Sequence, residues 1–351
     1  MRVLIDNYRN LTAGHCGSGA MRNLIFHYTG LDLPEGVIFG LGAGLDCVFV
    51  SNDSMQPPAM LFGRGASMEV DLAAALGIDY REQIELDNDI AWQLVKDEIV
   101  AGRPTMLSGD IYYLDYREFK VHFPAHRFVL VGFDEDKQEV YIADRTDVDI
   151  QTCSMQALRD SRNPTKGGMS TFNNWGKFFD TKIKHDLPYA CGLALHKTVL
   201  QMQGIDKTQQ ELMSIIGGKD GEVVAGLAGI RAFREHFQTW RDSEHTYANI
   251  QYSDSAIIKF GTGGGFFRDH FVSFMHWSKQ QRPDLVTDTT IGLAEEAAKG
   301  WNDLSPTLRA LMKDTTNDQL WLQADAQILD LYETEYTMFG FLADLVLRGS
   351  V

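Results

Sequence analysis

The sequence predicts an α+β fold in two domains, and three observations lead to this prediction. The chain has 351 residues, which is long for one compact unit. Residues 1–165 mix helical and strand patterns, whereas the pattern after about residue 200 is mostly helical. Residues 161–176, SRNPTKGGMSTFNNWG, are polar and rich in Gly, Asn and Ser, as domain boundaries often are. We therefore expect domains at 1–165 and 166–351.

The first domain is expected to begin with a helix and to continue into a sheet. In residues 17–29 apolar side chains recur with the spacing of one buried helix face. Residues 36–47, GVIFGLGAGLDC, are glycine-rich, which indicates close backbone packing or a turn. Residues 89–100 predict a second amphipathic helix, ended by a glycine and a proline. Strand-like stretches follow at 105–108, 127–133 and 138–143.

The second domain is expected to be built from amphipathic helices. Apolar residues recur at spacings of three and four between Leu227 and Trp240. Ser305 and Pro306 are typical of an N-cap followed by proline at the first helical position. Residues 317–347 predict one long helix or two.

The overall charge and cysteine content restrict the functional class. The formal net charge is −16, which disfavours general binding to nucleic acid or anionic membranes and suits an amine-bearing substrate. The N-terminal residues lack the apolar core of a signal peptide, and no apolar run is long enough to span a membrane. Four widely spaced cysteines make neither a disulfide scaffold nor a zinc pair. We therefore expect a cytoplasmic protein.

Cys16 is the candidate nucleophile. It lies in the run GHCGSGAMRNLIFHY, among small flexible residues and directly before the predicted helix. A thiol at a helix N-terminus lies beside the positive end of the helix dipole, which lowers its pKa and populates the reactive thiolate. The free N–H groups there can also receive a developing oxyanion. Cys47, Cys153 and Cys191 have no comparable setting, so we interpret them as core residues.

His126 and Asp144 are the candidate base and its orienting carboxylate. Residues 123–145 show a β-hairpin pattern with a polar turn at residues 134–137. If the turn is centred near Glu135, His126 faces Asp144 across the hairpin, while a register slip of one residue would bring Arg145 there instead. A carboxylate in that position can fix the tautomer of an imidazole whose other nitrogen faces a thiol. The sequence therefore contains a coherent Cys–His–Asp set.

Two other motifs carry weaker alternatives. The spacing of His122 and His126 suits a metal pair, but Pro124 interrupts the strand and no thiol or carboxylate ligands cluster nearby, so no metal is expected. The GTGGG at 261–265 lacks the Lys-Ser/Thr ending of a nucleotide-binding P-loop. It predicts a tight turn into a helix, with a phosphate cradle beside Arg268 as the alternative.

Several separated motifs together resemble the BtrH-like family, whose namesake is an acyltransferase of butirosin biosynthesis. The resemblance covers nearly the whole chain and rests on HCGSGAMRNLIFHY, FGLGAGL, FGR, GDIYYLDY, HFPAHRFVLVGFD…VYIAD, GLAGIRAFREHFQTW and GTGGGFFRDHF. It implies a papain-like cysteine-peptidase N-terminal domain and a mostly α-helical C-terminal domain that covers the active-site cleft.

The resemblance also implies a reaction. An acyl or aminoacyl group would pass from a phosphopantetheine thioester on an acyl or peptidyl carrier protein, through Cys16, to a small amine acceptor. No permanently bound cofactor is implied. His126 would be the general base and Asp144 its orienter. Asn10 occupies the position of the papain oxyanion glutamine, six residues before the cysteine, and keeps its NH₂ donor on a shorter side chain.

Other residues and functions stay open at this point. Asp110, Tyr112 and Tyr113 would bind a cationic amine, or else form an exposed loop, and Arg268 would bind the pantetheine phosphate. The same Cys–His–Asp set would serve a cysteine peptidase or amidase in which water is the acceptor. A non-enzymatic member that binds a carrier protein or peptide is the third possibility, and a homodimer is compatible with the sequence.

Overall fold

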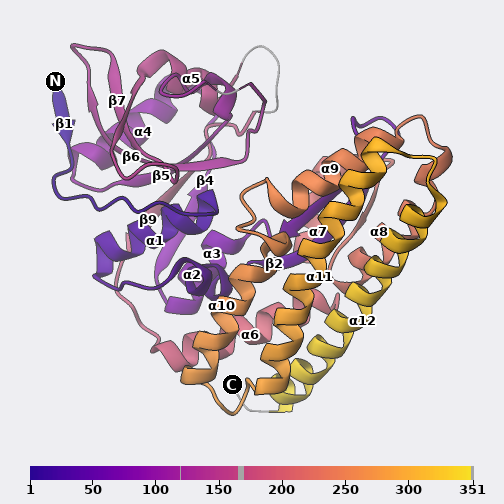
Figure 1. Ribbon diagram of the computed structural model, residues 1–351. Coiled ribbons are helices and arrows are strands. Elements are labelled where there is room, and N and C mark those ends of the chain that lie inside the picture. The colour runs from indigo at the N-terminus through magenta and orange to yellow at the C-terminus, as the bar shows by residue number, and fades with distance from the viewer. Residues whose placement is uncertain (119, 165–169, 349–351) are drawn as a thin grey trace. The chain divides into compact units, whose positions relative to one another are not determined.

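The protein forms two compact units in a computed structural model that describes residues 1–118, 120–164 and 170–348 (Figure 1). One unit combines Met1–Glu35 with Gly77–Lys184, and the other combines Gly36–Leu76 with His185–Val351. This division differs from the single boundary expected after residue 165, because strands near residues 45–64 pair with a strand near residue 223. Residues 165–169, within the expected boundary stretch, lie outside the described residues.

The first unit is built around a mixed-order antiparallel sheet. Its strands run in the order β4-β9-β5-β6-β7-β8, and β1 pairs with the far end of β6. Their bounds are β1 Arg2–Leu4, β4 Asp79–Gln83, β5 Thr105–Gly109, β6 His126–Asp134, β7 Glu139–Ala143, β8 Gln151–Ser154 and β9 Trp175–Asp180. The expected strands at 105–108, 127–133 and 138–143 are confirmed as β5, β6 and β7.

The helices of this unit begin and end at recognisable cap residues. Helix α1 (Cys16–Thr29) has His15 as its N-cap and ends at Gly30, whose φ of 74° is a left-handed conformation that glycine adopts without strain. Helix α4 (Asn88–Val100) is capped by Asp87, whose carboxylate accepts from two backbone N–H groups. A short 3₁₀ helix, η1 (Ile111–Tyr113), and helix α5 (Met155–Arg162) complete the unit. The two predicted helices, 17–29 and 89–100, are confirmed.

A buried apolar cluster holds this sheet and its helices together. It contains residues of α4, β5, β6 and β7, among them Val95, Leu107, Phe128 and Ile142, with Trp175 of β9. Helix α1 packs against β6 and β5. The start of α1 is thereby held near the N-terminal end of β6, where His126 lies.

The second unit combines a small antiparallel sheet with most of the helices. Its strand order is β10-β2-β3. The strands are β2 Leu45–Ser51, β3 Ala59–Arg64 and β10 Glu222–Val224. The helices are α2 Glu35–Leu41, α3 Met68–Leu76, α6 Leu187–Met202, α7 Thr208–Gly217, α8 Leu227–Phe237, η2 Trp240–Asp242, α9 Thr246–Ile258, η3 Gly265–Phe267, α10 Arg268–Gln281, α11 Asp288–Lys313 and α12 Asp318–Arg348.

Long helices dominate this unit, as the sequence predicted. Figure 1 shows α8 and α11 lying along α12, and each of them packs against α12. Residues 317–347 form one helix rather than two. Large aromatic side chains fill the interior between these helices and β2, including Phe49, Phe233, Phe266 and Trp301. Among the described residues, none of the helices combines the length and the apolarity needed to cross a bilayer.

Two local expectations fall in this unit, and the first is confirmed. Residues 36–47 form most of α2, a tight turn and the start of β2. The close packing expected there is present, since a Cβ on Gly40 would lie 1.9 Å from Cγ of Phe274. Ser305 is no N-cap, because Pro306 lies inside α11 and the Ser305 hydroxyl donates to Asp254 at 2.6 Å.

Candidate active site in the first unit

Cys16 is the first residue of α1 and is buried, with 7% of its surface exposed. The loop before it is anchored by the Glu35 carboxylate, which accepts from the backbone N–H groups of Gly14 at 2.9 Å and His15 at 2.8 Å. The same carboxylate accepts from the Ser18 hydroxyl at 2.9 Å. Three hydrogen bonds to one carboxylate therefore hold the start of α1 in a single conformation.

A second set of contacts fastens this loop to the end of the hairpin. Ala13 N–H donates to the Arg145 carbonyl at 2.9 Å. The Arg145 guanidinium donates back to the Gly14 carbonyl at 2.7 Å. The segment that carries Cys16 therefore runs alongside the residues that follow β7. This pairing joins positions more than a hundred residues apart, and it brings the thiol to the histidine of β6.

His126 and Asp144 meet, but not through the register expected from the sequence. Val129 lies opposite Ala143, so the pairing is displaced by two residues, and a bulge follows between Leu130 and Gly132. Asp144 thus falls diagonally to His126 rather than opposite it. Side chains alternate along a strand, so a displacement of two residues keeps both side chains on one face. His126 Nε2 lies 3.0 Å from Asp144 Oδ1.

Asp144 is held by further donors. Its Oδ1 accepts from the Arg145 backbone N–H at 2.7 Å, and its Oδ2 accepts from the Tyr116 hydroxyl at 2.8 Å. Burial opposes the charge of Asp144, but the His126 imidazole and these donors outweigh it and lower the pKa of Asp144 to about 2. The carboxylate is therefore ionised at neutral pH and fixed in orientation.

The imidazole of His126 is held in its charged form. Burial lowers its pKa, but the charge and hydrogen bond of Asp144 outweigh burial, with a smaller contribution from Cys16, and raise the pKa of His126 to about 9. Because Nε2 contacts Asp144, Nδ1 is the nitrogen left for the sulfur. A side-chain hydrogen bond between the Cys16 thiol and the His126 imidazole contributes to the pKa shifts of both groups.

The thiol of Cys16 is shifted towards the thiolate. Burial raises its pKa, but the electrostatic effect of the neighbouring His15 and the hydrogen bonds from His126 and His15 outweigh burial, so the pKa of Cys16 lies well below its usual value. His15 also accepts the Ser18 backbone N–H on Nδ1 at 3.1 Å, which caps α1. Within the part of the chain that the structure describes, the backbone N–H groups of Cys16 and Gly17 have no acceptor. They can donate to an oxyanion at the sulfur.

The other cysteines behave as core residues, as expected. Cys47, Cys153 and Cys191 are all buried and free. Burial raises the pKa of each, to about 11 for Cys191, so these thiols are protonated at neutral pH. The contrast with Cys16 comes from the two imidazoles beside it.

Asn10 has a different role from the one expected. Its Nδ2 donates to the backbone carbonyls of Asp144 at 3.0 Å and Asp147 at 2.7 Å. Its Oδ1 accepts from Asn23 at 3.1 Å. A primary amide has two N–H donors, so both are used and none remains for an oxyanion. The oxyanion assignment of Asn10 is therefore wrong in this structure; Asn10 fastens the N-terminal segment to the end of β7.

In the loop expected to bind an amine, most polar groups form hydrogen bonds within the protein. The Asp110 carboxylate is fully buried and accepts from the backbone N–H groups of Tyr112 at 3.1 Å and Phe123 at 2.9 Å. It also contacts His122 Nδ1 at 2.7 Å. Asp110 therefore shapes the loop and is not free to pair with a cationic ligand. The Tyr112 ring, 48% exposed, stacks on the His122 ring, and Tyr113 lies edge-on to Tyr112.

Arg268 does not bind a phosphate at the GTGGG turn. The guanidinium is fully buried and donates to both carboxylate oxygens of Glu335 at 2.8 Å. The turn itself is tight, as the sequence predicted, and residue 264 needs glycine. Its φ is 108°, and a Cβ there would lie 2.3 Å from Asp269 Oδ2. The expectation for Arg268 is wrong because an internal acid already neutralises it.

Sequence reasoning missed four supporting residues: His15, Glu35, Tyr116 and Arg145. His15 directly precedes Cys16, and its side chain caps the N-terminus of α1. The adjacent histidine and cysteine in the sequence could have pointed to this residue. Tyr116 closes the GDIYYLDY motif. Glu35 and Arg145 act from distant positions, so no local pattern marks them.

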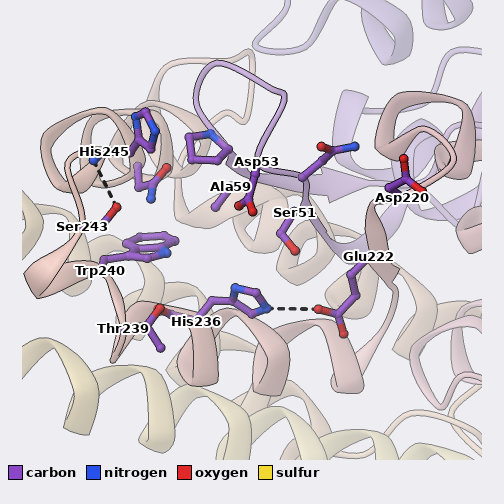
Figure 2. Close-up of a pocket in the computed structure, with 13 residues that line it drawn as sticks. Ser51, Asp53, Ala59, Asp220, Glu222, His236, Thr239, Trp240, Ser243 and His245 are labelled. Carbon is purple, nitrogen blue, oxygen red and sulfur yellow. Dashed lines mark hydrogen bonds and ion pairs between the residues drawn. The ribbon is translucent and has the colours of Figure 1, made fainter.

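The second unit also has a polar cavity, of about 310 Å³. Figure 2 shows Ser51, Glu222 and His236 near one another, with Trp240 on another side. His236 Nε2 pairs with Glu222 at 3.0 Å, but no hydrogen bond joins Ser51 to His236 among the described residues. Among the described side chains, His236 therefore does not activate Ser51 as a nucleophile. Within the described ranges, no three His, Cys, Asp or Glu side chains gather as metal ligands either.

Fold and site together define an α+β protein with a buried Cys–His–Asp cluster. Residues 15–145 match the family model for butirosin biosynthesis protein H, N-terminal, and residues 156–342 match the Domain of unknown function (DUF4872). The chain therefore belongs to the butirosin biosynthesis protein H-like family. All three clustered side chains lie within the N-terminal match. A comparison with curated proteins gives no match.

Proposed function

We propose that this protein is a cysteine-dependent acyltransferase of natural-product biosynthesis, which forms an amide through an acyl group carried on Cys16. The observation that carries the proposal is the thiol at the start of α1, with its pKa lowered by two imidazoles and one imidazole fixed by a buried carboxylate. The family name adds the biosynthetic setting. A thiolate–imidazolium pair of this kind is the usual starting point of acyl transfer through cysteine.

We also propose that the first unit is papain-like. A cysteine at the first position of a helix that packs on a sheet supports that assignment, as does a histidine on β6 whose partner directly follows the adjacent antiparallel strand β7. His126 contacts Asp144 through Nε2 and leaves Nδ1 for the sulfur. This assignment concerns the geometry of three side chains and would stand whichever acyl acceptor is used.

The proposed reaction has two steps. The Cys16 thiolate attacks the carbonyl of a thioester, and the N–H groups of Cys16 and Gly17 donate to the oxyanion. The carbon–sulfur bond to the donor breaks, and the His126 imidazolium protonates the leaving thiolate. The acyl group is then held on Cys16 as a thioester. An amine attacks, His126 accepts its proton, and the Cys16 thiolate leaves as the amide forms.

The donor and acceptor follow from the same chemistry. A thioester is reactive enough to acylate a thiol reversibly, and a phosphopantetheine arm on an acyl or peptidyl carrier protein presents one. We propose such a carrier as the donor and a small amine as the acceptor. The net charge of −16 favours a cationic amine over an anionic one.

Intact-protein mass spectrometry tests the proposal. Wild type is incubated with an acyl-loaded carrier protein, or with an acyl thioester of N-acetylcysteamine, and peptide mapping then locates any added acyl mass. We expect the acyl group on Cys16 and none on the Cys16→Ala variant, while Cys191→Ala behaves as wild type. Absence of acylation on folded wild type would refute the proposal.

Adding amines separates transfer from hydrolysis. An acyl-enzyme that yields an amide with a primary amine supports the transferase. Only free acid, or cleavage of peptides without thioester turnover, would assign the cluster to a cysteine peptidase or amidase instead.

A further inference from the structure

Arg162 is a buried cation, and none of the buried anions among the described residues pairs with it. It is the last residue of α5, and only 2% of its surface is exposed. Its Nη2 donates to the Asn173 carbonyl at 3.0 Å, while its Nε has no hydrogen-bond partner. No ion pair to Arg162 exists among the described residues. Residues 119, 165–169 and 349–351, which lie outside them, contain no acidic side chain.

Burying an unpaired guanidinium costs free energy unless a bound anion neutralises it. Removing a guanidinium from water without a counter-charge is strongly unfavourable, so buried arginines are almost always paired. Burial lowers the pKa of Arg162 to about 10, and no neighbouring charge opposes that effect. The group is nevertheless protonated at neutral pH. Arg159, one helical turn earlier, shows the ordinary case: it is half-exposed and pairs with Asp89 at 2.7 Å.

Arg162 lines a cavity in the first unit. The cavity has a volume of about 360 Å³, near the lower end of the range of about 300–1,000 Å³ for small-molecule sites. Its apolar lining comes from Trp92 of α4 and from Met155 and Leu158 of α5. The acid in the lining, Glu135, is already paired with Lys96 and with the N-terminal amine. The charge left over in the cavity is therefore positive.

We infer that this cavity binds a small organic carboxylate, with its carboxylate on Arg162 and its carbon body against Trp92, Met155 and Leu158. The planar guanidinium matches a carboxylate in shape and donor spacing. Because Arg162 supplies a single positive charge, we expect the ligand to carry a single negative charge. The apolar walls favour an organic anion over inorganic phosphate, which would leave them solvated. Nothing in the proposed acyl transfer uses Arg162, so the site is independent of that function.

Calorimetric titration with benzoate tests this inference. The titration is run at fixed ionic strength, with benzamide as the neutral probe of the same shape and inorganic phosphate as the anion without a carbon body. We expect saturable benzoate binding with a Kd below about 1 mM, and binding of benzamide and phosphate at least about tenfold weaker. No saturable benzoate heat, or equal binding of benzamide, would overturn the inference.

Variants locate the binding. Arg162→Met keeps the length of the side chain and removes the charge, so benzoate affinity should fall about tenfold or more. Arg81→Met, an exposed arginine of the same unit that pairs with Asp79 and lies outside the cavity lining, should change it less than about twofold. If Arg162→Met fails to fold, Met155→Trp fills the cavity and leaves the charge in place. Unchanged benzoate binding in Met155→Trp, or in folded Arg162→Met, would place the ligand elsewhere and refute the site.

Discussion

Each unit of this protein buries charge, and the two do it differently. In the second unit all three nitrogen atoms of Arg268 donate to buried acceptors: Nε and Nη2 to Glu335, and Nη1 to two backbone carbonyls. Trp301 adds a donor to Glu335 at 2.7 Å. In the first unit the Cys16 sulfur, the neighbouring N–H groups and the Arg162 Nε keep capacity to bind.

The comparison shows that burial of a charge does not by itself mark a functional site. Arg268 and Arg162 are both buried arginines, but the acid beside Arg268 raises its pKa against burial, while the pKa of Arg162 is lowered by burial alone. A saturated cluster stabilises the fold. A cluster that keeps unsatisfied donors or a titratable nucleophile is a candidate binding or catalytic site.

The largest expected effect is on stability in the second unit. Glu335→Gln leaves the fully buried Arg268 without its counter-charge, so the free energy of unfolding should fall by about 3–5 kcal/mol. Urea denaturation followed by tryptophan fluorescence measures the loss. Glu295→Gln is the matched control, because its partner His276 and Glu295 itself are exposed. A loss below about 1 kcal/mol in Glu335→Gln would contradict the structural role.

Breaking the corresponding contact in the first unit should act mainly on chemistry. Asp144→Asn removes the charge that stabilises the His126 imidazolium and allows the wrong tautomer. We expect acyl transfer to fall about 10²-fold or more, with thiol alkylation at neutral pH slowed as well. Steady-state rates with the acyl thioester measure the first effect. Asp149→Asn, nearby and exposed, serves as control; equal rates in Asp144→Asn and wild type would refute the orienting role.

The Cys16 thiol should separate by pH from the thiols of the other three cysteines, one of which lies in the same unit. The lowered pKa of Cys16 means that the thiolate persists as the pH falls below neutrality, whereas the raised pKa values of Cys47, Cys153 and Cys191 keep those thiols protonated. Iodoacetamide should therefore label Cys16 first at about pH 6, by at least about tenfold over the other three. Mass mapping after short pulses gives the rates. In denatured protein all four cysteines should be labelled at similar rates. Similar rates in the native protein would show that Cys16 is an ordinary buried thiol.

The smallest effect is expected at Tyr116. Tyr116→Phe removes one hydrogen bond to Asp144 and leaves the ring in place, so transfer should slow about three- to tenfold. The pKa of Asp144 should rise, because a donor to its charged form is lost. The acid limb of the pH–rate profile would then shift to higher pH. Tyr141→Phe, whose hydroxyl contacts exposed Arg2, is the control. If the pH–rate profile of Tyr116→Phe does not shift, Tyr116 contributes to packing only.

The sequence alone determined the local features of this site. A glycine-flanked cysteine before a 3.6-residue apolar repeat predicted the start of α1, and alternation around a polar turn predicted β6 and β7. The predicted contact between His126 and Asp144 was correct even though the register was displaced by two residues, because side-chain direction repeats every two residues.

Only the tertiary structure decided which polar groups remain free. Asn10, Asp110 and Arg268 carry the right chemistry for the roles the sequence predicted, but each is used by partners far along the chain or in a folded loop. Likewise Glu35, Arg145 and the unpaired Arg162 acquire their roles from contacts that no local pattern encodes. Periodicity is written in neighbouring residues, whereas hydrogen-bond partners are fixed only when distant segments pack.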